Sequence, residues 1–329
     1  MRGPVSAVGS VGVVIVDWNA AALVTRCLTA LSRQTVRPHA IVVVDNASDS
    51  ETWRHVTDEH LRMDMVRLVE NCGFAAGTNR GIALAAECDW IAVLNPDAFP
   101  EPGWLERLLV AAAAHPEYSF FASRQVKADD PGRLDGTGDA YAVCGRAWRR
   151  DHGLDARGTR LAPEEVFGPC AAAALYRREA LAEVGGFDER FFCYFEDVDL
   201  AFRLRLAGHR CLYVPDAVVH HVGSASSGRG SDFSVYHGHR NLVWTYVKNM
   251  PGPLLGLYWP HHLVLNLVSL AWFTLRGQGR AIWKAKWDAF RGLPRVLRER
   301  REIQARRRVG SRELRLLMVG GWRGFGLGR

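Results

Sequence analysis

Four short apolar runs alternate with amphipathic helices before residue 115, and this alternation restricts the fold that the chain can adopt. The runs have the length and composition of buried strands, at residues 11–16, 41–44, 65–69 and 90–94. Helical segments are predicted at residues 20–32, 75–86 and 102–114, with a further helix after Asp49. Strands and helices joined in this order by short links are typical of a mostly parallel sheet flanked by helices. The sequence therefore predicts the α/β class.

Polar residues stand at the end of each predicted strand. Because parallel strands point the same way, these residues should line one crevice: Asp17, Asn19, Asp45, Asn46, Asn71 and Asp97. At Asn95-Pro-Asp97 the proline cannot continue a central strand, so the chain must turn out of the sheet and deliver Asp97 to its carboxyl edge. A carboxylate there suits Mg²⁺ or Mn²⁺ bound together with substrate phosphates. The alternative is that Asn95 and Asp97 only cap the following helix.

A second acidic motif lies among aromatic residues. Four aromatic side chains within residues 191–195 precede Glu196 and Asp197, which open a helix predicted to run to Ala207. Acidic residues in a first helical turn can simply favour the helix dipole. Carboxylates set among aromatic rings are also partly desolvated, which raises their pKa and makes them better bases near neutral pH.

Between these motifs the pattern is less regular. Residues 119–165 contain turns and loops between short strands, and we expect mixed sheet and loops that face an acceptor. Buried strands are predicted again at residues 171–176 and 211–214. Beyond them, His220 and His221 precede a Gly/Ser loop, as either a metal ligand beside a lid or a solvated turn.

The C-terminal part differs in charge from the rest of the chain. Residues 276–329 hold 16 Lys or Arg against 4 Asp or Glu, which leaves the first 275 residues mildly acidic. An apolar segment at 263–275, flanked by Trp259 and Trp272, is too short to span a bilayer and is predicted to lie in a membrane interface. The alternative is a hydrophobic helix packed on the body or on a second subunit. No nucleic-acid-binding motif accompanies the basic residues, so anionic headgroups are the predicted partner.

Cysteine usage and the N-terminus indicate the compartment. Seven scattered cysteines without a C-x-x-C pair fit a reducing cytosol. No charged segment followed by a long apolar stretch marks a secretory signal at the start of the sequence.

Taken together in order, several spaced motifs resemble the inverting glycosyltransferases of family 2, which have the GT-A fold. They are Val13-Val-Ile-Val-Asp-Trp-Asn19, Val42-Val-Val-Asp-Asn-Ala-Ser48, Asn71-Cys-Gly-Phe-Ala-Ala-Gly-Thr-Asn79-Arg-Gly81, Leu94-Asn-Pro-Asp97, Phe195-Glu-Asp-Val-Asp-Leu200, His221-Val-Gly-Ser-Ala-Ser-Ser227 and Arg240-Asn241. The resemblance covers roughly residues 11–250 and is greatest to a bacterial rhamnosyltransferase-like branch.

The resemblance implies roles for individual residues. Those expected to hold the nucleotide-sugar are Asp17, Asn19, Asp45, Asn71, Gly73, Phe74, Gly77, Asn79, Asn95 and Arg240. Asp97 stands at the family's metal-binding D-x-D motif, whose first position is Asn95 here, and either His221 or His220 should complete the site of a divalent cation (Mg²⁺ or Mn²⁺). Asp197, beside Glu196, is similar to the family's general base.

The implied function is an inverting, metal-dependent transfer of a sugar, expected to be L-rhamnose from dTDP-rhamnose, to a lipid-linked or polysaccharide acceptor at the inner face of the cell membrane. Residues 1–250 would form the catalytic domain, with a nucleotide-binding half at 11–118 and an acceptor half at 119–250. Residues 251–329 would form a helical, basic extension that binds the membrane or mediates homo-oligomerisation.

Three alternatives remain at this point. One is a hexosyl or galactofuranosyl transferase that uses a UDP-sugar. Another is a non-catalytic relative that binds glycans or membranes. A nucleotidyltransferase is disfavoured, because residues 17–22 contain neither the Gly nor the Lys expected of a triphosphate-binding loop.

Overall fold

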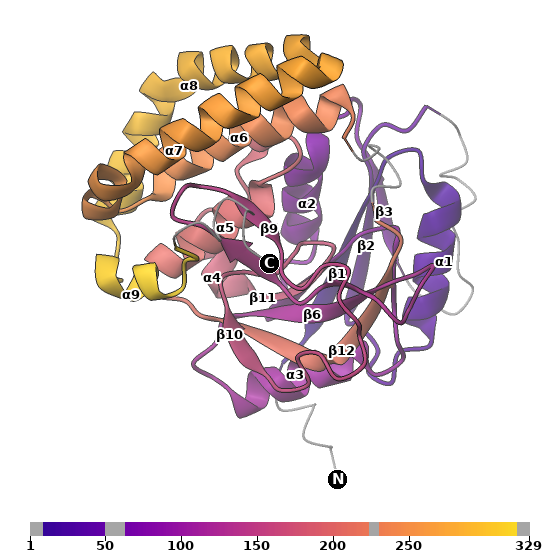
Figure 1. The fold of residues 1–329 in the computed structure, drawn as a ribbon. Helices are drawn as coiled ribbons and strands as arrows, with labels where there is room; N and C mark the ends of the chain where they lie inside the picture. The colour runs from indigo at the N-terminus through magenta and orange to yellow at the C-terminus, as the bar shows by residue number, and fades with distance from the viewer. Residues whose placement is uncertain (1–8, 50–62, 224–229, 321–329) are drawn as a thin grey trace.

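The computed structural model describes residues 9–49, 63–223 and 230–320. Within these residues the protein is built on a ten-stranded sheet with helices on both faces (Figure 1). Eight strands follow one another in the order β10-β12-β6-β11-β4-β1-β2-β3, while β5 pairs with β12 and β7 with β6. The helix predicted after Asp49 falls outside the described residues.

The first half of the sheet is parallel, as the sequence predicts. It consists of β1 (Val11–Asp17), β2 (Ala40–Asp45), β3 (Asp64–Arg67) and β4 (Trp90–Leu94). The side chains of β1 alternate between the two faces, with Val13 and Ile15 in one apolar cluster and Val14 and Val16 in the other. Burial on both faces explains why this strand is apolar throughout.

The second half makes the sheet mixed. Its strands are β5 (Ala98–Pro100), β6 (Phe120–Lys127), β7 (Leu134–Gly136), β10 (Glu164–Val166), β11 (Ala173–Arg177) and β12 (Cys211–His221). Strand β11 lies antiparallel between β4 and β6, because the chain returns to it from the carboxyl edge after the long excursion over residues 128–172. The α/β prediction is confirmed, but the parallel arrangement is limited to β4-β1-β2-β3 and to the pair β6–β12.

One strand extends beyond its predicted end. The sequence predicted that this strand ends at Val214, before Pro215, yet β12 continues to His221. The pairing register between β12 and β6 shifts between Val214 and Val218, so the proline is accommodated at a bulge. Of the two alternatives left open for the histidines, a solvated turn does not hold, because His220 and His221 are the last two residues of β12.

Helices cover the two faces of the sheet in separate groups. One apolar cluster includes residues of α1 (Ala21–Ser32) and α3 (Trp104–Ala114). The other includes residues of α2 (Gly73–Leu84), α4 (Arg178–Glu183) and α5 (Glu196–Leu206). Helix α2 lies very close to β1, since a Cβ atom on Gly81 would stand 2.3 Å from Cγ1 of Val14 and one on Gly77 would stand 2.8 Å from Cγ1 of Val16.

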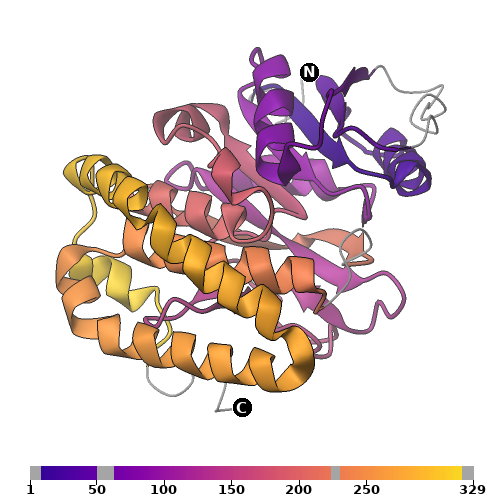
Figure 2. The ribbon, with the colours of Figure 1, turned by 90° about the horizontal axis from the view of Figure 1, so that it is seen from above.

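The C-terminal helices form a layer beside the sheet-containing body (Figure 2). They are α6 (Asp232–Asn249), α7 (Gly252–Phe273), α8 (Gly279–Ala305) and the short α9 (Ser311–Leu316). Helices α7 and α8 form an antiparallel hairpin whose turn includes Gly277 at φ 83°. Helix α6 packs between α8 and the body, and Tyr246 and Met250 join it to Phe202 of α5 in one apolar cluster.

The apolar segment of the extension is longer than predicted. Helix α7 runs for 22 residues through Pro260, not only over 263–275. In the described part of the chain, the helical stretch that begins at Gly252 is long and apolar enough to cross a bilayer by length and composition alone. Most of its large apolar side chains are exposed.

Candidate functional site

A cavity of about 560 Å³ opens at the carboxyl edge of the sheet. Its walls come from strand ends, from the start of α2, from the loop before α5 and from the hairpin of β8 (Asp139–Tyr141) and β9 (Ala147–Arg149). The polar and charged residues that line it are Asn46, Asn71, Asn95, Asp97, Asp139, Arg149, Glu196, Asp197 and His221. A deep crevice at this edge is where open α/β sheets bind ligands.

The turn before α2 is fixed by two asparagines. The Asn46 amide donates to Oδ1 of Asn71 at 2.9 Å, and Oδ1 of Asn71 also accepts from the Gly73 N–H at 2.9 Å. Gly73 has φ 86°, and a Cβ atom there would stand 2.5 Å from the carbonyl oxygen of Phe192. The turn therefore needs glycine, and it brings Asn71, Gly73 and Phe74 to the cavity as predicted.

Three other residues predicted to bind the nucleotide-sugar, Asp17, Asn19 and Asp45, are not part of the cavity lining. Oδ1 of Asp17 accepts from the Ala20 N–H at 3.0 Å, and Oδ1 of Asp45 accepts from the Ser48 hydroxyl at 2.5 Å. Asn19, at φ 55°, donates from its amide to Asp49 at 3.1 Å. These contacts brace the loops after β1 and β2, and Val16 and Trp18 line the cavity at this point.

Burial perturbs one of these carboxylates. Asp17 is only 2% exposed, and desolvation raises its pKa to about 6, with a smaller contribution from the negative charge of Asp45. Asp17 therefore titrates close to neutral pH.

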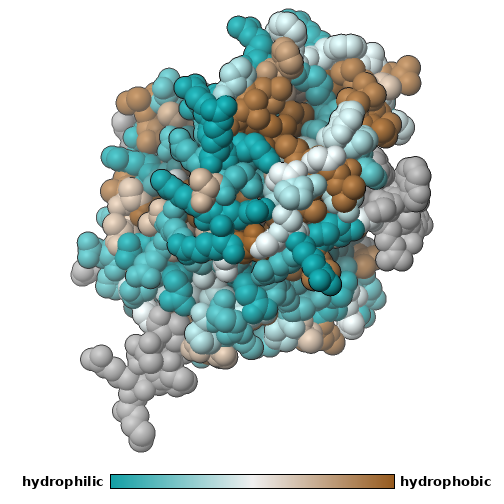
Figure 3. Space-filling view, turned by 90° about the vertical axis from the view of Figure 1, so that its left-hand side faces the viewer, coloured by the Kyte–Doolittle hydropathy of each residue, from teal (hydrophilic) through white to brown (hydrophobic). Residues whose placement is uncertain are grey.

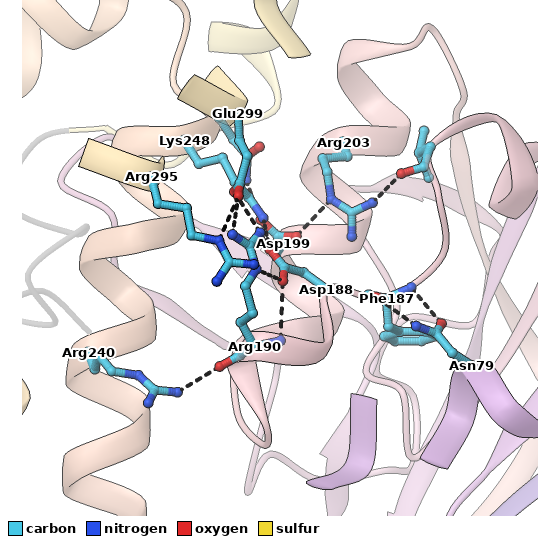
Figure 4. A network of polar contacts seen from close by, with 12 residues as sticks. Asn79, Phe187, Asp188, Arg190, Asp199, Arg203, Arg240, Lys248, Arg295 and Glu299 are labelled. Carbon is cyan, nitrogen blue, oxygen red and sulfur yellow. Dashed lines mark hydrogen bonds and ion pairs between the residues drawn. The ribbon is translucent and has the colours of Figure 1, made fainter. Parts of the chain in front are cut away.

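Three further residues that were predicted to bind the nucleotide-sugar contact other parts of the protein. Gly77 packs against β1, as described above. Asn79 donates to the Phe187 carbonyl at 2.8 Å and accepts from the Phe187 N–H at 2.9 Å, and Nη2 of Arg240 donates to the carbonyl oxygens of Arg190 and Phe191 at 3.0 and 3.1 Å (Figure 4). In the structure Asn79 and Arg240 hold the loop that precedes α5, and their contacts with a nucleotide stay predictions.

The candidate metal corner forms because two segments pair. Asp97 directly precedes β5, and Ala98 of β5 is the register partner of His221 on β12. Nε2 of His221 lies 3.2 Å from Oδ1 of Asp97, while Oδ2 of Asp97 accepts from the Gly223 N–H at 3.1 Å. Although burial opposes it, contact with His221 holds the pKa of Asp97 below its usual value.

The two histidines face opposite ways, because successive residues of a strand do. His221 is 1% exposed and lines the cavity, whereas His220 points to the other side, where its Nε2 lies 3.2 Å from Oε1 of Glu101. Of the two residues that the sequence left open, His221 is the one beside Asp97.

The corner suits a divalent cation that shares its shell with a ligand. Within the described residues, Nε2 of His221 is a buried atom without a hydrogen-bond partner, next to a carboxylate oxygen. No group of three or more His, Cys, Asp or Glu side chains surrounds one point in those residues. Asp97 and His221 would be the two protein ligands, and Mg²⁺ or Mn²⁺ would take its others from water and phosphate oxygens.

Three carboxyl groups in the lining of the same cavity lie close enough to influence one another: Glu196 and Asp139 are buried, and Asp197 is partly buried. Desolvation raises the pKa of Asp197, Glu196 and Asp139, and the charge of Asp197 raises the other two further. Oδ1 and Oδ2 of Asp197 accept from the backbone N–H groups of Val198 at 2.8 Å and Ala171 at 3.2 Å. The Arg149 guanidinium favours its ionised form. Asp197 is thus an oriented carboxylate with a raised pKa, as a general base requires.

The loop before α5 has an unusual backbone. Phe192, Tyr194 and Phe195 have φ angles of 65°, 68° and 66°, which residues other than glycine rarely adopt. The buried Asn241 amide of α6 compensates by donating to the carbonyl oxygens of Phe191, Cys193 and Tyr194 at 2.9, 3.0 and 2.7 Å. This loop therefore depends on α6 for its shape.

Ion pairs join the same loop to the C-terminal helices (Figure 4). Nζ of the buried Lys248 lies 2.6 Å from Asp188 and 2.8 Å from Asp199. Arg190 pairs with Asp188 and with Glu299 of α8. The segment that leads to Asp197 is consequently held by both α6 and α8.

Several residues in or next to the cavity belong to a region whose local sequence pattern predicts no role for them. Asp139, Trp148 and Arg149 line the cavity, and Asp135 pairs with Arg149 behind it; all four come from the irregular region 119–165. The signal available was the segment Asp135-Gly-Thr-Gly-Asp139, in which two carboxylates flank a glycine turn. Their role could not be predicted because residues 128–172 fold back over the sheet edge through long-range contacts.

Comparisons with known proteins agree with this geometry. Residues 12–185 match the model of the family described as glycosyl transferase family 2. The chain is 33% identical over 252 residues to the N-acetylglucosaminyl-diphospho-decaprenol L-rhamnosyltransferase of Mycobacterium tuberculosis (strain ATCC 25618 / H37Rv), covering 68% of this chain and 80% of that protein.

Solved structures resemble it in fold. GalNAc-T7 with UDP, GalNAc and Mn²⁺ superposes with a TM-score of 0.63 at 16% identity, over 80% of this chain and 51% of that one. S. aureus TarS 1-349 in complex with UDP-GlcNAc gives a TM-score of 0.58 at 16% identity, over 90% and 88%. The fold of the chain is GT-A. Because the family model matches more than half of the chain, the chain belongs to glycosyltransferase family 2, and its similarity to the mycobacterial protein makes it a rhamnosyltransferase-like glycosyltransferase.

Proposed function

We propose that the protein is an inverting, metal-dependent glycosyltransferase that moves a sugar from a nucleoside-diphosphate donor to an acceptor hydroxyl. The observation that carries the proposal is that one and the same cavity is lined by the Asp97–His221 pair and by Asp197. A single displacement needs these two functions on opposite sides of the anomeric carbon.

On the side of the sugar donor, Asp97 and His221 would hold Mg²⁺ or Mn²⁺. When bound, the metal ion would neutralise the negative charge that develops on the leaving diphosphate. The turn with Asn71 and Gly73 would bind the nucleotide next to this corner. Asn95, adjacent to Asp97 in the cavity wall, would contribute to the same half.

At the acceptor end, Asp197 would accept the proton of the attacking hydroxyl. Its two backbone hydrogen bonds fix the carboxylate, and its raised pKa brings its basicity closer to neutral pH. General base catalysis of this kind typically contributes about 10²–10⁴-fold to the rate. Glu196, whose pKa burial raises well above its usual value, would stay protonated beside it.

The donor proposed is dTDP-rhamnose and the acceptor a lipid-linked or polysaccharide glycan. Support comes from the mycobacterial relative, whose name describes rhamnose transfer to a diphospho-decaprenol-linked sugar. A UDP-sugar donor is the alternative, since TarS was crystallised with UDP-GlcNAc. In this proposal residues 1–250 form the catalytic part and 251–329 an extension.

We also propose that the extension adsorbs to the inner face of the cell membrane. The hairpin of α7 and α8 exposes Trp259, Trp272, Leu275, Trp283, Trp287 and Phe290. Figure 3 shows hydrophobic side chains gathered at the top of the molecule, where this hairpin lies, above a mainly hydrophilic surface. Arg276 and Lys284 flank these residues, and tryptophans beside basic groups suit the interface of an anionic membrane.

The experiment that tests the enzymatic proposal is the release of nucleoside diphosphate from a panel of nucleotide-sugars, with and without Mn²⁺ or Mg²⁺. Metal-dependent hydrolysis of dTDP-rhamnose alone is expected. Hydrolysis of a UDP-sugar alone would identify the alternative donor. Neither hydrolysis nor donor binding by calorimetry would favour the non-catalytic alternative and contradict the proposal.

A further inference from the structure

Asp135 lies at a contact that the proposed mechanism does not use. It belongs to β7, which pairs with β6 beside β12, and its side chain is only 1% exposed. Its Oδ2 lies 2.7 Å from Nδ1 of His221, whose side chain is equally buried. This is a short, charge-assisted hydrogen bond between two groups that water does not reach.

This contact decides which nitrogen of His221 is available. An ionised carboxylate can only accept, so Nδ1 must carry the hydrogen and donate it to Asp135. Nε2, which faces Oδ1 of Asp97 at 3.2 Å, is then the nitrogen that would offer its lone pair to a metal ion that takes the place of a hydrogen there. A carboxylate behind the distal nitrogen also fixes the ring orientation of metal-binding histidines and raises their basicity.

Two more groups hold the carboxylate itself in place. Nη1 of Arg149 pairs with Oδ2 of Asp135, and Nδ1 of His152 lies 3.4 Å from Oδ1. The ion pair with the Arg149 guanidinium favours the ionised form of this carboxylate. The carboxylate is therefore ionised and oriented before any ligand binds.

The neighbouring histidine provides an internal comparison. His220 has a carboxylate partner of the same kind, Glu101, at 3.2 Å. That pair lies on the opposite face of β12, and the Glu101 side chain is 49% exposed. Of these two carboxylate–histidine pairs, the one with Asp135 involves the histidine that lines the cavity, and the one with Glu101 does not.

We propose that Asp135 is a positioning residue for the metal site: it holds His221 in the tautomer and orientation in which Nε2 serves as a ligand beside Asp97. The inference rests on the proposed function and extends it to a residue from the 119–165 region. Removal of such a partner typically weakens metal binding about 10–100-fold.

The test is Mn²⁺ binding by the full-length protein in the presence of a saturating nucleoside diphosphate, measured from the free Mn²⁺ signal in electron paramagnetic resonance. Asp135→Asn is expected to raise the Kd for Mn²⁺ by about 10–100-fold. Glu101→Gln, the matched control, is expected to leave that Kd unchanged. The Kd for the nucleoside diphosphate without metal should be the same in all three proteins, whereas collapse of the site would weaken both ligands.

The outcomes separate the inference from the proposal beneath it. If the unsubstituted protein binds Mn²⁺ and Asp135→Asn binds it equally well, Asp135 has no positioning role, although the proposed function stands. If the unsubstituted protein binds the nucleotide but no Mn²⁺, the metal-dependent function fails and the inference fails with it. Should Asp135→Asn not fold, Asp135→Glu keeps the charge, moves the carboxylate by one methylene and is also expected to weaken Mn²⁺ binding.

Discussion

Asp17 and Asp45 are register partners at the last position of the parallel pair β1–β2, so two carboxylates stand side by side at the edge of the sheet. Asp45 is braced by Ser48 and lies 3.4 Å from Nε of Arg67. Asp17 has no ion-pair partner among the described residues, and desolvation together with the Asp45 charge raises its pKa to about 6.

Asp17→Asn should therefore stabilise the protein at pH 8. Because the pKa of Asp17 is higher in the folded state, the native fold loses stability as pH rises from about 4 to above 6. This loss corresponds to at most about 3 kcal/mol, and Asn can still accept from the Ala20 N–H. Urea unfolding at pH 8 and at pH 4.5 measures it. If the difference in unfolding free energy between Asp17→Asn and the parent were the same at both pH values, the raised pKa of Asp17 would be contradicted.

Asp197→Asn should reduce transfer by at least about 10²-fold while the Kd for the donor stays unchanged. The amide keeps the shape of the side chain but cannot accept the proton. Single-turnover transfer and donor calorimetry are the measurements, and the exposed Asp216 provides the control Asp216→Asn, which should be as active as the parent. Near-normal turnover of Asp197→Asn would mean that another group is the base.

The pH–rate profile should depend on Arg149. Desolvation raises the pKa of Asp197 while Arg149 lowers it, so the acid limb of kcat lies above the range of an ordinary aspartate. Arg149→Met removes the positive charge, which should raise the pKa of Asp197 and move that limb to higher pH. A limb at the same pH in both proteins would show that Asp197 does not control it.

Asn241→Ala should destabilise the protein by about 2–4 kcal/mol, because it leaves three carbonyl groups of the strained 191–195 loop without their donor. The free energy of unfolding in urea measures this. Since the same loop leads into Asp197, kcat should fall more than donor affinity does. Unchanged stability would mean that other contacts suffice to hold the loop.

The double substitution of Trp283 and Trp287 by Glu should reduce binding to vesicles that contain phosphatidylglycerol by more than about 10-fold. Both side chains are about 60% exposed on α8. Co-sedimentation with anionic and with neutral phosphatidylcholine vesicles tests this, and Leu161→Glu on the body is the control, because Leu161 is equally exposed. Equal binding of both variants to anionic vesicles would exclude the hairpin as the membrane contact.

The sequence predicted those strands and helices whose buried residues form a recognisable pattern over a few neighbouring positions. The parallel half of the sheet followed from continuous apolar runs, and Asp97 followed from the proline that ends β4. Neither needs information from distant segments, because side-chain burial and backbone stereochemistry act within a few residues. The same holds for the start of α5 at Glu196.

The tertiary structure decided which of these polar residues meet. Pairing of β5 with β12 brings His221 rather than His220 to Asp97, and the bulge after Val214 keeps that strand intact through Pro215. The segment over residues 128–172 folds back so that Arg149 lines the cavity and Asp135 contacts His221 behind it. Asn79 and Arg240 instead bind loop carbonyl groups. Each outcome depends on strand register or on contacts between residues far apart in the chain, and local sequence pattern contains neither.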